Sequence, residues 1–106
     1  MGTGKLASQA GHAYVEAALN AQSNCPDRFS HYRRDGLGTK ICLGVENEKQ
    51  LLELQQRCQH QGVPATLITD HGCTNFFGGK PTITALGVGP VQRHEIKPIL
   101  GHLKLL

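Results

Sequence analysis

A glycine-rich turn followed by a lysine lies at Gly2, Gly4 and Lys5, before a segment with a helical pattern. At a helix N-terminus, unpaired backbone N–H groups and the positive end of the helix dipole favour an anion. The turn is therefore a candidate site for a phosphate or a developing oxyanion, with Lys5 as a mobile positive charge. The spacing is not that of a Walker A loop. The alternative is a frayed terminal turn with a solvated lysine.

Gln9 and His12 continue one side of the same expected helix. Gln9 follows Lys5 by four residues and His12 follows Gln9 by three, the spacings that bring side chains together on a helix. These residues are candidates for lining a polar groove with Lys5. An ordinary solvent-facing helix surface is the alternative.

A second candidate region is the loop that begins at Asp70, directly after an expected strand. Ligands of α/β sheets usually bind at such strand ends. Asp70 can act as a base or orient a water molecule, Thr74 can form hydrogen bonds, and Gly72 lets the backbone approach a ligand. The alternatives are an ordinary turn and a nucleophilic pair of Cys73 with His71.

A basic cluster follows the first expected helix, and a net charge of +3 permits an anionic partner. Such a cluster can follow a nucleic-acid backbone, and an interleaved aromatic ring can stack on a base. A solvated helix face is the alternative. The cluster consists of Arg28, Arg33, Arg34 and Lys40, with His31 and Tyr32 among them.

The elements that must position these residues are predicted from periodicity and capping signals. A face of small residues, including Ala13 and Ala17, predicts that the first helix packs close to a sheet. Asn47 is expected to cap the third helix, with Gln50 completing a capping box. Helices are expected at residues 4–21, 27–34, 48–61 and 91–100, and strands at residues 39–45, 65–69 and 82–88.

This order predicts an α/β fold, a three-layer sandwich in which helices flank a small mixed β-sheet. The 106 residues suffice for one small domain. The sequence holds no apolar run long enough to span a membrane and no apolar signal segment. The four cysteines form no C-x-x-C pair, so a zinc site is not expected, and we interpret them as reduced thiols of a cytoplasmic protein.

Four stretches of the chain resemble motifs of the archaeal/eukaryotic-type (type 2) peptidyl-tRNA hydrolases. Residues 2–13 resemble the family's G-x-G-K-x-A-x-Q-x-x-H-A helix start, and residues 70–74 resemble its D-x-G-x-T loop. Residues 84–90 resemble its T-x-L-x-I-G-P strand and turn, and residues 101–106 resemble its G-H-L-x-L tail. The motifs occur in the family's order, so the resemblance implies a single domain over residues 1–106.

The resemblance implies hydrolysis of the ester that joins a peptide to the terminal ribose of tRNA, which recycles tRNA during translation. Lys5, Asp70 and Thr74 match active-site positions of the family, so we expect them to be catalytic. Asp70 would orient the attacking water, Lys5 would stabilise the oxyanion and Thr74 would fix the water or the ester. No metal and no cofactor are implied. The residues expected to bind the peptidyl-tRNA substrate are Gln9, His12, Gly72, Thr84, Arg33 and Arg34.

The sequence departs from the family's pattern in two places. Cys73 stands where family members usually carry an arginine, which is expected to weaken RNA contact. The family also has a hydrophobic strand before the glycine-rich turn, whereas this sequence begins within the turn. We therefore expect either a truncated start or a depleted domain that forms a homodimer along the gap. The alternative function is a non-catalytic RNA- or protein-binding module on the same fold.

Overall fold

Two antiparallel strands form the sheet against which the helices pack. The computed structural model describes residues 2–34, 36–70 and 81–106. In chain order the elements are α1 (Thr3–Asn24), α2 (Pro26–Arg33), α3 (Glu48–His60), β1 (Ala65–Asp70), β2 (Thr82–Val88) and α4 (Arg93–Leu100).

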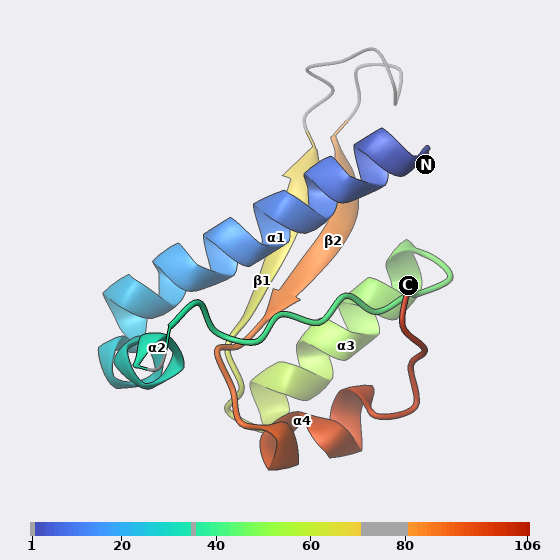
Figure 1. Ribbon diagram of the computed structural model, residues 1–106. Coiled ribbons are helices and arrows are strands. Elements are labelled where there is room, and N and C mark those ends of the chain that lie inside the picture. The colour runs from blue at the N-terminus through green and yellow to red at the C-terminus, as the bar shows by residue number, and fades with distance from the viewer. Residues whose placement is uncertain (1, 35, 71–80) are drawn as a thin grey trace.

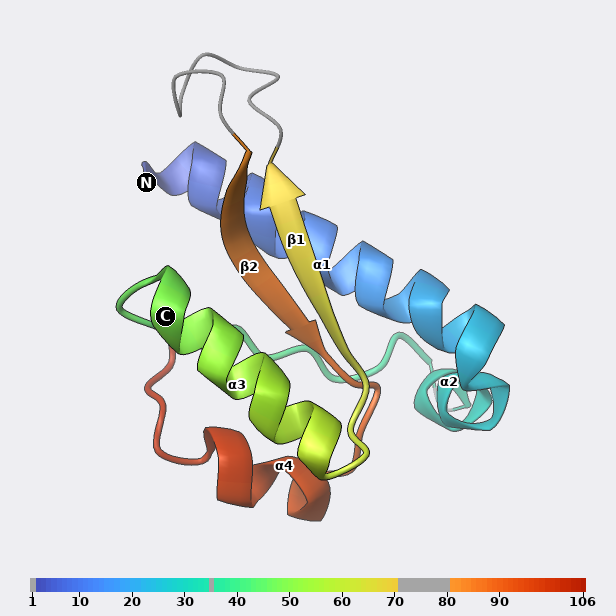
Figure 2. The ribbon, with the colours of Figure 1, turned by 180° about the vertical axis from the view of Figure 1, so that it is seen from behind.

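The pairing of the strands fixes which residues meet at each end of the sheet. Ala65 lies opposite Val88, and Asp70 lies opposite Thr82. Helix α1 crosses one face of the sheet and α3 covers the other, so the order of layers is helix, sheet, helix (Figures 1 and 2). The N-terminal part of α1 lies beside the end of the sheet that carries Asp70 and Thr82 (Figure 1).

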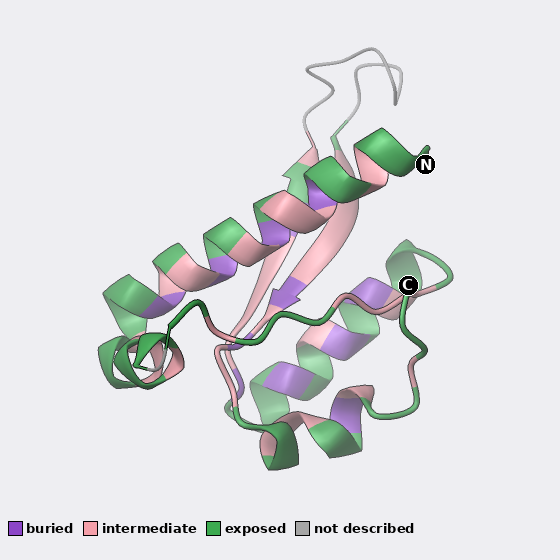
Figure 3. Ribbon diagram, viewed as in Figure 1, coloured by how far each residue is buried: buried purple, intermediate pink, exposed green. Residues whose placement is uncertain are grey.

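Small residues let α1 approach the sheet closely, as its sequence pattern predicts. Ala13, Ala17 and Ala21 are buried on the sheet side of α1 (Figure 3). On the sheet, Gly87 faces this stripe, and a Cβ atom at Gly87 would lie 2.5 Å from the carbonyl oxygen of Ala13. Only glycine leaves room for that approach, so residues in the first turns of α1 can reach the strands with their side chains.

On the opposite face, α3 and α4 close a second apolar cluster. It consists of Leu54, Cys58, Val63 and Ile99, with Leu86 and Val88 of the sheet packed against it. The predicted cap of α3 is confirmed, since Asn47 Oδ1 accepts a hydrogen bond of 2.9 Å from the Gln50 backbone. The Gln50 side chain, however, accepts from the backbone N–H of Glu46 and not of Asn47.

The predicted strand at residues 39–45 is wrong. In that segment only Leu43 forms a strand-like bridge, and its partner is Leu105 near the C-terminus. The backbone N–H of Gly44 accordingly donates to Lys104 and that of Leu106 to Cys42, at 2.9 and 3.0 Å. Alternating hydrophobicity predicts an extended backbone but does not identify its partner. In the described residues the predicted mixed sheet is therefore a two-stranded antiparallel sheet.

The helix bounds differ from the predicted ones by up to three residues. α1 continues to Asn24, and α4 begins at Arg93 because Gln92 is its N-cap and forms a capping box with Glu95. The predicted strands at residues 65–69 and 82–88 are confirmed, the first with one more residue. None of the helices in the described ranges has the length and apolar character needed to cross a membrane.

Candidate active site

Lys5 and Asp70 form an ion pair that joins the first turn of α1 to the end of β1. Lys5 Nζ lies 2.6 Å from Asp70 Oδ2, and the two side chains are 15% and 9% exposed. The residues are 65 positions apart in the sequence. The fold therefore brings together the two sequence regions that were predicted to carry chemistry. Because the pair is largely removed from water, its charges interact more strongly than at a surface.

Gln9 is the second donor to the same carboxylate oxygen. Its Nε2 atom lies 3.2 Å from Asp70 Oδ2, and the residue is only 3% exposed. It is the only buried polar residue in the described part of the chain. Its position one helical turn after Lys5 lets both side chains reach Asp70 from one helix.

Thr84 of β2 completes the cluster from the other strand. Its hydroxyl donates to Gln9 Oε1 at 2.5 Å. Lys5, Gln9, Asp70 and Thr84 thus form a continuous polar network between α1 and the sheet. Every buried side-chain nitrogen and oxygen atom in the described ranges has a hydrogen-bond partner.

The arrangement has a definite chemical capacity. Two donors on Asp70 Oδ2, one of them charged, favour the ionised carboxylate. An ionised carboxylate can accept a proton of a water molecule and aim its oxygen at an electrophile. The neighbouring ammonium of Lys5 can stabilise negative charge that develops on that electrophile. A group that orients water and a cation that stabilises an oxyanion are what a hydrolytic site requires.

The remaining residues predicted around this site fall into two groups. His12 is exposed on α1 and makes no hydrogen bond to the cluster within the described residues. Four residues with predicted roles lie outside the described residues, namely His71, Gly72, Cys73 and Thr74.

One of the three described cysteines, Cys58, is excluded as a nucleophile. Cys25, Cys42 and Cys58 are free thiols. Cys58 is fully buried, and burial raises the pKa of its thiol, which makes it inert as a nucleophile. The described ranges also contain no group of three or more His, Cys, Asp or Glu side chains placed to hold a metal ion.

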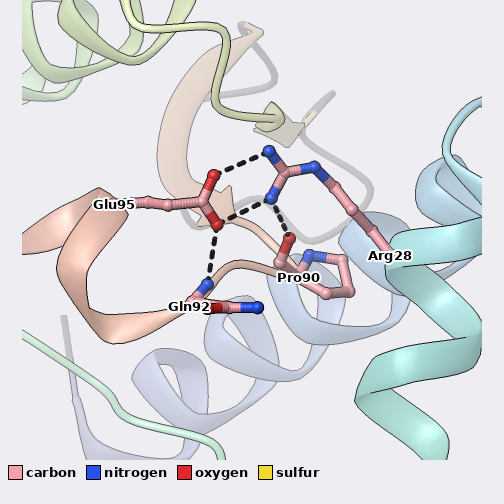
Figure 4. A network of polar contacts seen from close by, with 4 residues as sticks. All are labelled: Arg28, Pro90, Gln92 and Glu95. Carbon is pink, nitrogen blue, oxygen red and sulfur yellow. Dashed lines mark hydrogen bonds and ion pairs between the residues drawn. The ribbon is translucent and has the colours of Figure 1, made fainter.

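Arg28 of the basic cluster forms an ion pair within the chain, which was not predicted from the sequence. Its guanidinium forms two parallel bonds of 2.9 and 2.7 Å with the carboxylate of Glu95 (Figure 4). The same group donates to the carbonyl oxygen of Pro90 at 3.2 Å, so it connects α2 to the start of α4 (Figure 4). The hydrogen bonds from this guanidinium, together with the one from the Gln92 backbone N–H, lower the pKa of Glu95 from its ordinary 4.5 to about 2. Sequence reasoning missed Glu95, whose only signal was its place three residues after the N-cap Gln92.

The other basic residues stay at the surface. Arg33 and Arg34 are exposed at the end of α2, and Arg33 donates to the carbonyl oxygen of Leu37. Lys40 Nζ lies 5.3 Å from the centre of the Tyr32 ring. Lys5 and Asn24 are nineteen residues apart on α1, and a rise of 1.5 Å per residue separates them by about 29 Å. The structure therefore places the basic cluster and the Lys5–Asp70 pair at opposite ends of α1 (Figure 1).

Comparison with known proteins gives a consistent result. Residues 1–106 match the family model described as peptidyl-tRNA hydrolase PTH2. A peptidyl-tRNA hydrolase of Methanocaldococcus jannaschii is 38% identical over 106 residues, which cover 100% of this chain and 90% of that protein. One of Thermococcus onnurineus is 39% identical over 97% of this chain and 85% of its own length. One of Nanoarchaeum equitans is 33% identical over 99% of this chain and 89% of its own length.

Proposed function

The chain belongs to the peptidyl-tRNA hydrolase PTH2 family, and we propose that Lys5, Asp70 and Thr74 are the catalytic residues with which it acts. Its activity is that of an ester hydrolase on peptidyl-tRNA, a reaction that returns tRNA to translation. The observation that carries the assignment of the site is the convergence of Lys5 and Gln9 on one oxygen of Asp70. In this proposal residues 1–106 act as one domain. That the protein is located in the cytoplasm stays a prediction.

In the proposed reaction, water is the nucleophile. Asp70 accepts a hydrogen bond from the water and aims its oxygen at the carbonyl carbon of the ester. As the new C–O bond forms, the carbonyl oxygen becomes an oxyanion, which Lys5 stabilises. The bond between the carbonyl carbon and the ribose oxygen then breaks. The ribose oxygen takes up a proton that the attacking water has released, and the peptide leaves as a carboxylic acid. Thr74 and Gly72 are assigned here from the family motif, Thr74 to hold the water or the ester and Gly72 to let the backbone approach the substrate.

The RNA part of the substrate is assigned to the opposite end of α1. Arg33 and Arg34 are exposed there, and arginine side chains commonly bind phosphate oxygens. A separation of about 29 Å along α1 means that these contacts lie well beyond the ester and would hold the body of the tRNA. Substrate contact by His12, which is exposed near the network, stays a prediction. Association into a homodimer also stays a prediction, which sedimentation equilibrium would check.

The proposal is tested with N-blocked aminoacyl-tRNA as substrate. The chain should release free tRNA, and Asp70→Ala should abolish release while keeping the circular dichroism spectrum. Thr66→Val is a matched control, because Thr66 also bonds to a side chain of α1 but at the far end of β1. Full activity of Asp70→Ala would refute the catalytic role. Salt-dependent tRNA binding by a folded chain without turnover would favour the alternative, a non-catalytic RNA-binding module.

A further inference from the structure

The buried amide of Gln9 must point one way for the site to work. Its two ends face different partners: Nε2 faces Asp70 Oδ2 at 3.2 Å, and Oε1 faces the Thr84 hydroxyl at 2.5 Å. An amide turned by 180° would place its oxygen against the carboxylate oxygen, and neither atom carries a proton to share. A group that anchors the amide in this orientation therefore helps Asp70 to keep its hydrogen bond from Gln9.

The carboxylate of Asp70, which can only accept, selects this orientation, and Thr84 is placed to anchor the other end of the amide in it. A threonine hydroxyl can both donate and accept, and donation to Oε1 leaves the amide nitrogen for Asp70. Because Gln9 is 3% exposed, water has little access to replace this bond if it is lost. The hydroxyl of Thr84 thus acts on the carboxylate through one intermediate side chain.

The backbone of β2 is irregular at this residue. The strand register passes from Ile68 opposite Ala85 to Thr69 opposite Ile83, so Thr84 is the extra residue of a β-bulge. Bulges redirect a side chain relative to the regular alternation of a strand, and they are frequent beside active sites. The residue that bonds to Gln9 is therefore also the residue at which the strand pairing is irregular.

A second threonine shows that the role is not shared by every threonine on this interface. At the other end of the sheet, Thr66 lies in regular register opposite Gly87 and accepts a hydrogen bond of 3.1 Å from Asn20 Nδ2. Both bonds tie a side-chain amide of α1 to a strand. Only the bond of Thr84 continues to a carboxylate, which makes Thr66 a matched structural control.

We propose that Thr84 is a positioning residue that acts through Gln9, anchoring its amide so that Nε2 holds the carboxylate of Asp70 in place for the attacking water. The inference rests on the proposed function and adds to it a role for a residue outside the catalytic set. In place of the substrate contact expected for Thr84 from the family motif, it predicts that loss of the hydroxyl impairs turnover and leaves substrate affinity nearly unchanged. A misplaced catalytic group can lower a rate about 100-fold.

The first experiment compares single variants in tRNA release. Thr84→Val should lower kcat about 10- to 100-fold with KM within about 2-fold. Thr84→Ser keeps the hydroxyl and should keep kcat within about 3-fold of the unmodified chain. Thr66→Val removes a comparable bond and should keep kcat within about 2-fold. If Thr84→Ser is as impaired as Thr84→Val, or if Thr66→Val is equally impaired, the inference is overturned.

The second experiment separates action through Gln9 from a general loss of packing. Because Thr84 acts only through Gln9, the double variant Gln9→Ala with Thr84→Val should be no slower than Gln9→Ala alone. Effects that multiply would show that Thr84 acts by another route and would overturn the inference. A folded but inactive unmodified chain contradicts the proposed function as well, whereas an active chain with a fully active Thr84→Val variant contradicts this inference alone.

Discussion

The two ends of α1 each lie beside an ion pair, and the two pairs are built differently. Arg28 and Glu95 are 33% and 23% exposed and meet through two parallel hydrogen bonds, with the Arg28 guanidinium also bonded to the Pro90 carbonyl. Lys5 and Asp70 are 15% and 9% exposed. There, Lys5 and Gln9 converge on a single carboxylate oxygen.

This difference separates a structural contact from a candidate catalytic one. The planar guanidinium of Arg28 matches the carboxylate of Glu95 and joins α2 to α4, which explains both side chains without a ligand. A lysine is instead a compact charge on a flexible stem, which can shift toward a developing oxyanion. The two residues of the less exposed pair also lie in two of the sequence motifs, and the structure connects them to a buried polar network. The type of cation and the geometry of the contact therefore indicate better than the mere presence of an ion pair whether the pair is structural or catalytic.

The largest expected effect is at the Lys5–Asp70 end. Lys5→Met keeps the length of the side chain but removes its charge, and it should lower kcat about 100- to 1,000-fold because the oxyanion loses its cation. Lys49→Met, on the exposed face of α3, is the control and should leave kcat unchanged. Steady-state tRNA release measures both. An active Lys5→Met variant would remove the distinction between the two ends.

An intermediate effect is expected at the Arg28–Glu95 end, in stability and not in activity. Glu95→Gln removes the charge but keeps an oxygen that can accept from the Gln92 backbone, as Glu95 does now. The pair is partly exposed, so solvent screening limits the expected loss of unfolding free energy to about 1–2 kcal/mol. Urea denaturation measures the loss, and kcat should be unaffected.

The contribution of the Arg28–Glu95 pair to the free energy of unfolding should depend on pH. The pKa of Glu95 falls from 4.5 to about 2 on folding, so the folded state favours the ionised carboxylate. This contribution is complete above pH 4.5 and is lost as the pH falls toward 2. The difference in unfolding free energy between the unmodified chain and Glu95→Gln should therefore shrink over that interval. A difference that stays constant down to pH 2 would contradict the ion pair.

The smallest effect is expected at the exposed arginines of α2. Arg33→Gln and Arg34→Gln should each raise KM a few-fold and leave kcat unchanged. Each should also reduce the magnitude of the slope of the logarithm of the tRNA-binding constant against the logarithm of the salt concentration by about one. Lys49→Met again serves as the control. Filter binding at several salt concentrations measures the slope. An unchanged slope in both variants would place the tRNA elsewhere on the protein.

Local signals in the sequence predicted much of the fold. The cap at Asn47, the bounds of β2 and the small-residue face of α1 depend on neighbouring residues, and the structure has all three. The strand expected at residues 39–45 was wrong, because a strand needs a paired neighbour and this segment pairs only through the bridge between Leu43 and Leu105. That partner is distant in sequence, so the local pattern could not indicate it.

The candidate site divides in the same way. Motif resemblance singled out Lys5, Gln9 and Asp70, and the structure brings them together. Resemblance did not indicate that Gln9 would be buried or that Thr84 would hold its amide, because both follow from contacts across the sheet. The pairing of Arg28 with Glu95 joins residues 67 positions apart and has no local signal, so this ion pair could not be predicted from the sequence.

The most direct measurement compares two isosteric charge removals in a single-turnover assay with N-blocked aminoacyl-tRNA. Asp70→Asn and Glu95→Gln each replace one ion-paired carboxylate by an amide, one at each end of α1. With both variants folded, the rate of ester hydrolysis should fall at least about 1,000-fold in Asp70→Asn and stay within about 3-fold of the unmodified chain in Glu95→Gln. Equal rates in the two variants, or a greater loss in Glu95→Gln, would contradict the assignment of catalysis to the Lys5–Asp70 end.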